Sequence, residues 1–200
     1  MANADAPRGA IPVRHRNGAP YNGAGTLYYV LSGYGTALYV GDPVIAITDS
    51  SDANGVPTVN RASAGAGNYI TGFVQAIAFG TTWPAVPVLR DSPRYHQAST
   101  EGYVLVCDDP DVLFEIQEDG DGGAMGAGAA GRNVDLIAGT GNAYTGWSGW
   151  ELNSNTLATT STLHMRVIAP VERVDNDPTL TNAKWLCAVN LHSQRNATGI

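Results

Sequence analysis

Residues 103–117 read YVLVCDDPDVLFEIQ, two apolar runs on either side of an Asp-Asp-Pro-Asp connection. Val, Leu, Ile, Phe and Tyr dominate both runs, and such residues favour the pleated, half-buried surface of a strand. Proline presets the backbone of a turn and aspartate bonds nearby backbone groups, so the connection is expected to be tight. The stretch therefore predicts two consecutive strands, at 103–107 and 112–117, the second with Glu115 and Gln117 on its solvent face.

The same sequence pattern extends along most of the chain, with short apolar or alternating runs separated by Gly, Pro, Asn and Asp clusters. The run at 184–192 is almost uniformly apolar, which is typical of a central strand covered on both sides. Residues 123–132 contain four glycines, which disfavour a helix and favour a loop. We predict an all-β fold, an antiparallel sandwich that resembles a jelly roll. Further strands are predicted at 26–31, 37–48, 68–79, 133–138, 149–152, 162–171 and 184–192.

The composition is poor in charge and rich in glycine. Charged residues make up 14% of the 200 residues, 24 are Gly, and the net charge is −7. A general nucleic-acid-binding protein needs a dominant basic surface, so no nucleic-acid partner is expected. A coiled coil is excluded because the required Glu, Lys and Leu content is absent. The sequence shows neither a secretory signal nor an apolar run long enough to span a membrane, so we expect no membrane partner.

The two ends differ from the middle of the chain. Residues 1–25 and 193–200 lack a strand pattern, so the sequence predicts extended N- and C-terminal arms around a β-sandwich body at 26–192. Arg8, Arg14 and Arg16 against Asp5 give the first 41 residues a net charge of +2, and the remainder therefore carries −9. The ends are either frayed or are arms that become ordered on a partner.

Seven of the 18 acidic residues lie within positions 108–121. Asp119 and Asp121 match the first positions of a calcium loop, but no glutamate follows at the distal position, so no metal site is predicted. A strand flanked by acidic turns is the favoured interpretation. The alternative is an acidic edge that receives a basic arm, for example from a neighbouring subunit.

No motif for catalysis stands out. The carboxylate pairs Asp109 with Glu115 and Asp135 with Glu151 could be imagined flanking a glycosidic bond, but nothing singles out either pair. The histidines lack metal-ligand spacing, and no GxSxG or phosphate-binding loop is found. We therefore predict no catalytic residues, no enzyme activity and no cofactor.

Two other residue groups leave alternatives open. Cys107 and Cys187 each lie in an apolar run, which favours buried thiols, although a disulfide between neighbouring strands stays possible. Tyr144, Trp147 and Trp150 place three large rings within seven residues. Such a cluster is used in core packing, in protein interfaces and as a stacking surface for ligands.

Four segments together resemble the cement, or decoration, proteins of tailed-bacteriophage heads. They cover the chain nearly from end to end, and no segment is a catalytic signature. The segments are APRGAIPVRH at 6–15 followed by NGA at 22–24, ALYVGDPV at 37–44, YVLVCDDPDVLFEIQED at 103–119, and NAKWL at 182–186 through NLH at 190–192 with NATGI at 196–200.

The resemblance implies a structural virion protein on the outer surface of the mature capsid, present in the host cytoplasm during assembly. Its partners would be the phage major capsid protein and a second copy of itself, as a homodimer or, as second choice, a homotrimer. The alternatives are a carbohydrate-binding or host-adhesion module that uses Tyr144, Trp147 and Trp150, and an unrecognised hydrolase. On the cement interpretation, the capsid-binding arm would use Arg8, Arg14 and Arg16, and the interface anchors would be Trp147, Trp150, Leu191 and Ile200.

Overall fold

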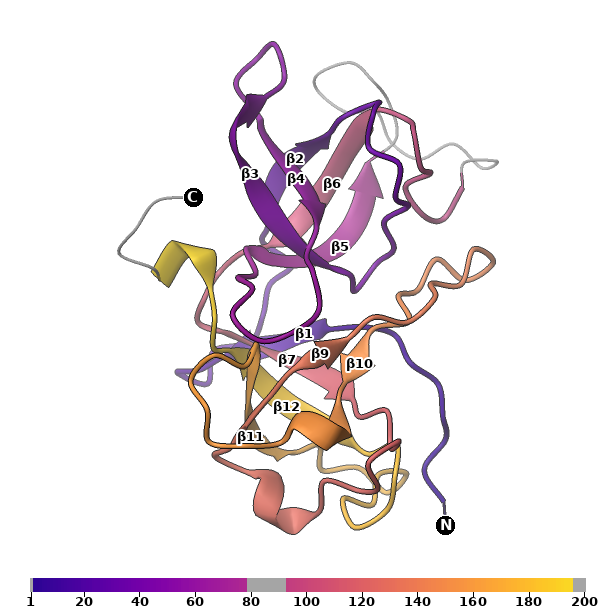
Figure 1. Ribbon diagram of the computed structural model, residues 1–200, viewed down its shortest axis with the longest axis vertical. Coiled ribbons are helices and arrows are strands. Elements are labelled where there is room, and N and C mark those ends of the chain that lie inside the picture. Colours follow the sequence, from indigo (N-terminus) through magenta and orange to yellow (C-terminus); the bar gives the residue numbers. More distant parts are fainter. Residues whose placement is uncertain (1, 79–92, 196–200) are drawn as a thin grey trace.

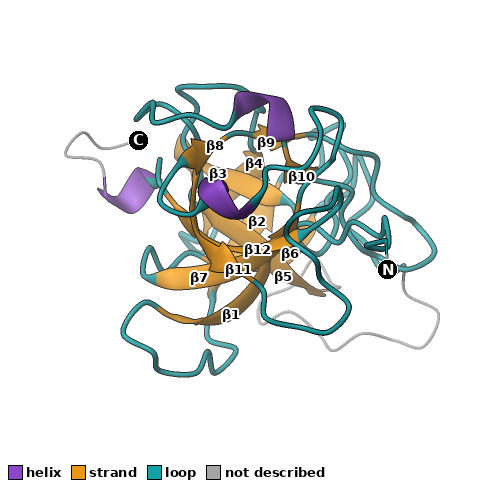
Figure 2. Ribbon diagram, turned by 90° about the horizontal axis from the view of Figure 1, so that it is seen from below, coloured by secondary structure: helices purple, strands orange, loops and turns teal. Residues whose placement is uncertain are grey.

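The computed structural model describes residues 2–78 and 93–195 as two β units joined along one axis. A closed five-stranded barrel occupies one end of the long axis and a five-stranded sheet the other (Figure 1). Viewed along that axis, the two units overlap (Figure 2). The strands are β1 (Ile11–His15), β2 (Thr26–Val30), β3 (Pro43–Ser51), β4 (Pro57–Arg61), β5 (Gly72–Ala78), β6 (Gly102–Cys107), β7 (Val112–Gln117), β8 (Asn133–Val134), β9 (Leu136–Ile137), β10 (Glu151–Leu152), β11 (Met165–Pro170) and β12 (Lys184–Val189).

The barrel runs in the order β2-β4-β3-β5-β6 and closes on itself. Its neighbouring strands pair antiparallel except β2 and β4, which meet in parallel at Tyr29 opposite Thr58. Closure removes the free strand edges that an open sheet would expose. Side chains that alternate along the strands fill its interior, among them the buried Val30, Val44, Val59 and Val104.

The sheet has the order β1-β7-β12-β11-β8, and every named pair in it is antiparallel. The apolar strand β12 lies between β7 and β11, as its composition predicted, and five of its six residues are buried. Phe114 on β7 and Trp185 on β12 point into the core on the inner face of the sheet. The two-stranded ribbon of β9 and β10 lies beside it, in contact with β7 through β10.

The barrel and the sheet meet in a hydrophobic cluster that is separate from the barrel interior. The ring of Phe73 on β5 meets that of Phe114 on β7 with 4.7 Å between centroids and a tilt of 54°. Cys107 at the end of β6 and Cys187 on β12 belong to the same cluster, and both are buried free thiols. The interpretation as small buried hydrophobes is confirmed.

The all-β class and the antiparallel pairing predicted from the sequence are confirmed. Residues 123–132 form a loop with one short 3-10 turn, η1 (Ala127–Ala129), as the glycines predicted. The structure is consistent with the predicted all-β sandwich, and its strands form a closed barrel joined to a five-stranded sheet. Two strands were missed, β1 and β4. The other 3-10 turns are η2 (Ser154–Thr156) and η3 (Ser193–Arg195).

The N-terminal segment is not a free arm, which corrects the predicted boundary at residue 25. Residues 11–15 form β1 and pair with β7, so they belong to the sheet. On the C-terminal side, residues 193–195 form η3, and positions 196–200, which include Ile200, lie outside the described residues.

The N-terminal segment touches the barrel where two glycines meet. Gly9 and Gly41 have φ values of 68° and 95°, a region that favours glycine. A Cβ on Gly9 would collide with the carbonyl oxygen of Gly41, and a Cβ on Gly41 would collide with that of Arg8. The amide of Ala10 donates to the Gly41 carbonyl at 3.0 Å. The contact therefore requires glycine on both sides.

We predict that Gly41→Ala destabilises the protein more than Gly18→Ala. Both positions have a similar positive φ, 95° and 90°, but nothing lies within 4 Å of a Cβ built on Gly18. The difference in the free energy of unfolding should be about 1–3 kcal/mol, because only position 41 adds a steric collision to the backbone cost. Urea unfolding of the two variants measures it, and equal losses would contradict the proposed close approach.

Candidate interaction surface

Residues 3–10, which we call the N-terminal strap, lie along one side of the sheet and are bound there by the side chain of Gln117 on β7, which also bonds Glu151 on β10. The amide nitrogen Nε2 of Gln117 donates to Asp5 Oδ1 and to Glu151 Oε1, each at 3.1 Å. The Oε1 of Gln117 accepts from the backbone amide of Ala6 at 3.2 Å. Gln117 is 3% exposed, so the prediction that it faces solvent is wrong: the strap covers it.

The start of the strap is held by Asn3. Its Nδ2 donates to the carbonyl oxygens of Asp177 and Thr181, both at 2.9 Å, and its Oδ1 accepts from the amide of Asp177 at 2.8 Å. The strap is thus fixed at Asn3, at Gln117 and at the Gly9–Gly41 contact. Side chains that it carries are presented from a set backbone, not from a frayed end.

Arg8 lies on the strap and reaches the ring of Trp147, with its guanidinium carbon 5.8 Å from the ring centroid. Trp147 comes from the loop at 139–149, which adds to the barrel through hydrogen bonds between Val40 and residues 146 and 148. The structure therefore brings together Arg8, a predicted arm residue, and Trp147, a predicted interface anchor. A hollow of about 410 Å³, here the tryptophan hollow, lies beside them and is lined by Ala6, Pro7, Arg8, Thr140, Asn142, Thr145, Trp147, Ser148 and Gly149.

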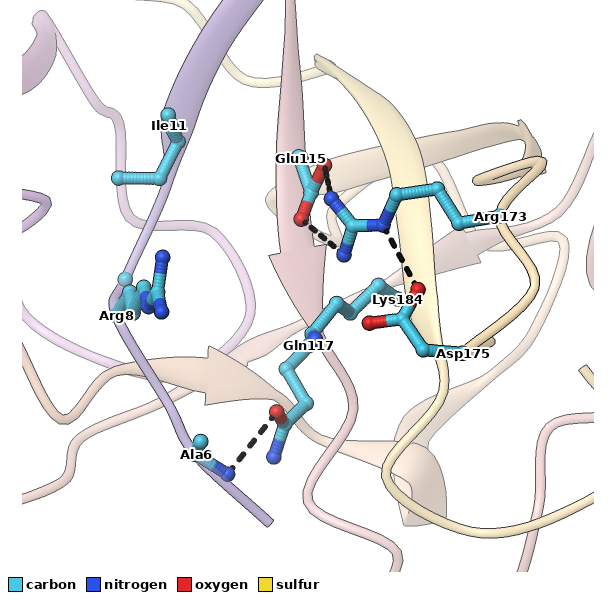
Figure 3. Close-up of a pocket in the computed structure, with 9 residues that line it drawn as sticks. Ala6, Arg8, Ile11, Glu115, Gln117, Arg173, Asp175 and Lys184 are labelled. Carbon is cyan, nitrogen blue, oxygen red and sulfur yellow. Dashed lines mark hydrogen bonds and ion pairs between the residues drawn. The ribbon is translucent and has the colours of Figure 1, made fainter. Parts of the chain in front are cut away.

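A second hollow of about 480 Å³ lies on the other side of the strap, over the outer face of the sheet (Figure 3). Arg173 closes one wall: its guanidinium binds both carboxylate oxygens of Glu115 at 3.1 Å and Asp175 Oδ1 at 3.2 Å. Lys184, the one lysine of the chain, lies on β12 opposite Gln117 and lines the same hollow. We call it the lysine hollow; its walls are Ala6, Arg8, Gly9, Ile11, Glu115, Gln117, Arg173, Asp175 and Lys184.

The other two predicted arm residues, Arg14 and Arg16, lie on β1 and directly after it. Arg14 on β1 is exposed and pairs in register with Leu113 of β7, and Arg16 follows the strand. Burial and the nearby charge of Arg195 lower the pKa of Arg16, while Asp111 opposes this effect. Among the described residues, Arg8 is the predicted arm residue that is seen to contact a predicted anchor, Trp147.

The acidic turn at 108–111 finds its basic partners within the same chain. His15 Nδ1 lies 3.3 Å from Asp109 Oδ2, and Arg195 pairs with Asp111. Asp108 accepts from the hydroxyl of Tyr28 at 2.9 Å. His15 of β1 and Arg195 of η3 therefore lie against the acidic turn, and a basic arm received from a neighbouring subunit stays a prediction.

The three predicted rings do not form one surface. Trp150 is 2% exposed and belongs to the hydrophobic cluster where the barrel and the sheet meet, so it does not lie at the surface as an interface anchor. Tyr144 is 86% exposed and lies under the guanidinium of Arg94, 6.0 Å from ring centroid to carbon. Trp147 is half-buried, and Leu191 is half-buried as well. Of the three rings, Tyr144 and Trp147 reach the surface of this loop.

The carboxylates considered for catalysis are each held by other groups. Glu115 binds Arg173, and Asp135 lies 2.9 Å from Nδ1 of the buried His164, whose pKa burial lowers. Among residues 2–78 and 93–195, no group of three His, Cys, Asp or Glu side chains could hold a metal ion. Within the same ranges, no helix has the length and apolar character needed to cross a membrane.

Sequence reasoning placed Gln117 on the solvent face, considered Glu151 only as a catalytic carboxylate, and gave Lys184 no role. Gln117 follows the alternation that places a side chain on the outer face, and only the path of the strap makes that face covered. Lys184 is unique among eleven basic residues, a signal that could have directed attention to its surroundings.

Glu151 should make stability depend on pH. Burial raises its pKa to about 7, the nearby carboxylate of Asp5 adds to the shift, and the hydrogen bond from Gln117 opposes it. A carboxyl whose pKa is raised by folding stabilises the fold while protonated, and this contribution is lost as the pH rises from about 4.5 through about 7.

We predict that Glu151→Gln is more stable than the wild type at pH 8.5, because the wild type then carries a half-buried negative charge near Asp5. The gain in the free energy of unfolding should be about 1–2 kcal/mol, since solvent screens part of that charge. The difference should vanish near pH 4, where the glutamate is neutral. Urea unfolding at both pH values measures it, with the exposed Glu172→Gln as the control. A difference that is the same at both pH values would refute the assignment.

We also predict opposite outcomes for two tryptophans. Trp150→Ala should lower the free energy of unfolding by about 3–5 kcal/mol, because it empties a core position. Trp147→Ala should cost about 1 kcal/mol or less, because the ring is partly solvated and its Arg8 contact is worth about 0.5–1 kcal/mol. Thermal and urea unfolding compare the two, and a larger loss at position 147 would be incompatible with this packing.

Comparisons of the chain with models of protein families, with curated proteins and with solved structures found no match.

Proposed function

We propose that this chain is a non-enzymatic structural protein that binds the outer surface of a mature phage capsid and cements neighbouring major capsid protein subunits. The observation that carries the proposal is the fixed strap, which presents Arg8 against Trp147 between two open hollows. Arginine and tryptophan are enriched among the residues that dominate protein interfaces. The resemblance to cement proteins supports the same partner.

A fixed strap suits a protein whose task is to adhere. Binding by a disordered arm would cost the entropy of ordering it, whereas Asn3 and Gln117 already hold these residues in place. The same anchoring means that the function does not depend on a loose tail. The contact surface is the folded side of the molecule that carries the strap and the loop at 139–149.

The mechanism is thermodynamic. A protein that binds only the expanded lattice stabilises that lattice by mass action, and a copy that bridges two subunits opposes their separation. Self-association as a homodimer, or as a homotrimer in second place, would add avidity because each oligomer engages several capsid subunits. We place the protein on the virion surface, and in the host cytoplasm during assembly.

The test is binding to expanded empty heads of the phage that encodes the chain. We expect wild-type protein to cosediment with heads and to raise the temperature at which they break. Arg8→Ala and Trp147→Ala should each reduce the apparent affinity about tenfold or more, since truncating an interface hot spot costs about 2 kcal/mol. Point variants are used because deleting the first 18 residues would remove β1 from the sheet.

Arg94→Ala is the matched control, because Arg94 makes the same kind of contact with Tyr144 elsewhere on the loop and does not touch the strap hollows. It should bind heads like the wild type. Wild-type protein that ignores expanded heads would overturn the proposal. Binding on a glycan array that Trp147→Ala abolishes would instead establish the adhesion alternative.

A further inference from the structure

We propose that a groove formed by the lysine hollow and a neighbouring hollow over the sheet binds an extended acidic segment of the partner, with a carboxylate held by Lys184 and Arg8. The identity of that partner as a capsid subunit rests on the proposed function. The binding chemistry rests on the groove alone. It has three components: shape, unpaired charge and an apolar floor.

The shape is that of two neighbouring hollows over the outer face of the sheet. Glu115 lines both the lysine hollow and a further hollow of about 280 Å³. We call the two together the sheet groove. The second part is lined by Val13, Arg14, Glu115, Ala169, Pro170, Val171, Glu172 and Leu186. A depression bounded by β1 on one side and residues 169–175 on the other suits a peptide in extended form.

The unpaired charges in the groove are mostly positive. Within residues 2–78 and 93–195, neither Lys184 nor Arg14 makes a side-chain hydrogen bond or ion pair, and Arg8 contacts only the Trp147 ring. The acidic Glu115 is already neutralised by Arg173 through both oxygens. Asp175 shares the same guanidinium, which leaves Glu172 at the far end as the one acidic wall without an ion pair among the described residues.

The excess of unpaired positive charge in the groove contrasts with the acidic composition of the whole chain. The protein carries a net charge of −7, yet the groove presents three cations that pair with no carboxylate among residues 2–78 and 93–195. Figure 3 shows Arg8 on the strap and Lys184 on β12 lining one hollow from opposite sides. A carboxylate placed between them would receive charge-assisted hydrogen bonds from both, which are the stronger class of hydrogen bond.

The floor and rim of the groove are apolar. Leu186 of β12 is buried at its base, and Val13 of β1 is 43% exposed at its edge, together with Ile11 and Pro170. Apolar contacts favour a peptide over a phosphate-rich ligand, which would need a wholly basic surface. The occupant is therefore a segment in which acidic and apolar side chains alternate, because alternate residues of an extended chain point to the same side.

The experiment titrates ¹⁵N-labelled protein with an acetylated, amidated heptapeptide of alternating Glu and Val, and with its Gln–Val counterpart. The acidic peptide should shift amide resonances of residues 11–15, 113–117 and 184–186, and its affinity should fall as salt is added. The Gln–Val peptide should bind at least tenfold more weakly. Equal affinity for the two peptides, or shifts confined to residues outside the groove, would overturn the proposal.

Lys184→Glu and Lys184→Gln are the informative variants. Reversing the charge should raise the dissociation constant of the acidic peptide at least tenfold, and removing it should have an intermediate effect. Arg94→Gln, an exposed arginine outside the groove, is the control and should bind as the wild type does. Thermal unfolding of each variant verifies that the fold is retained.

Head binding separates this inference from the proposed function. Wild-type protein that binds the acidic peptide in the groove but not expanded heads keeps the groove and refutes the capsid partner. Wild-type protein that binds heads, with Lys184→Glu binding equally well, keeps the cement function and refutes the groove.

Discussion

The close approach of Gly9 and Gly41 is the constraint on which the interaction surface depends. Neither residue can carry a side chain, because a Cβ on Gly9 would lie 2.3 Å from the carbonyl oxygen of Gly41, and a Cβ on Gly41 would lie 2.2 Å from that of Arg8. The contact seats the strap against the barrel at one point, while Gln117 and Asn3 tie it to the sheet at others. Arg8 is thereby brought to Trp147, and the two hollows open on either side of it.

Several charged side chains near the strap and the sheet groove are paired within the chain. Arg195 pairs with Asp111 and His15 Nδ1 lies beside Asp109, so the acidic turn at 108–111 is occupied by groups of the same chain. Arg173 similarly neutralises Glu115 in the sheet groove. Among the described residues, the cations Arg8, Arg14 and Lys184 make no ion pair, whereas Asp5 and Glu151 share the side-chain amide of Gln117. These local cations contrast with the net charge of −7 of the whole chain.

Much of the fold could be predicted, because alternating and uniformly apolar runs report burial directly. The strand at 112–117 was predicted at its observed bounds, and β12 was correctly expected to be central. β4 begins with Pro57, and β1 contains Pro12 next to a register shift, so neither shows a clean strand pattern. Strand order was beyond reach, because local periodicity does not say which strands pair.

The site could be predicted only in part, since its residues are distant in the sequence. Arg8 and Trp147 were each selected, but on separate grounds, and Trp150 was selected although it fills the core. Gln117 reads as a solvent-facing residue until the strap is placed over it. Such assignments depend on long-range contacts, which one sequence without structure does not contain.

A cryo-electron microscopy reconstruction of expanded heads mixed with this protein tests the central claim most directly. We predict density for the protein on the outer capsid surface, with the strap and the loop at 139–149 facing the major capsid protein. Density that contacts the capsid only through the barrel end of the molecule, or a bare outer surface at saturating protein, would contradict the account.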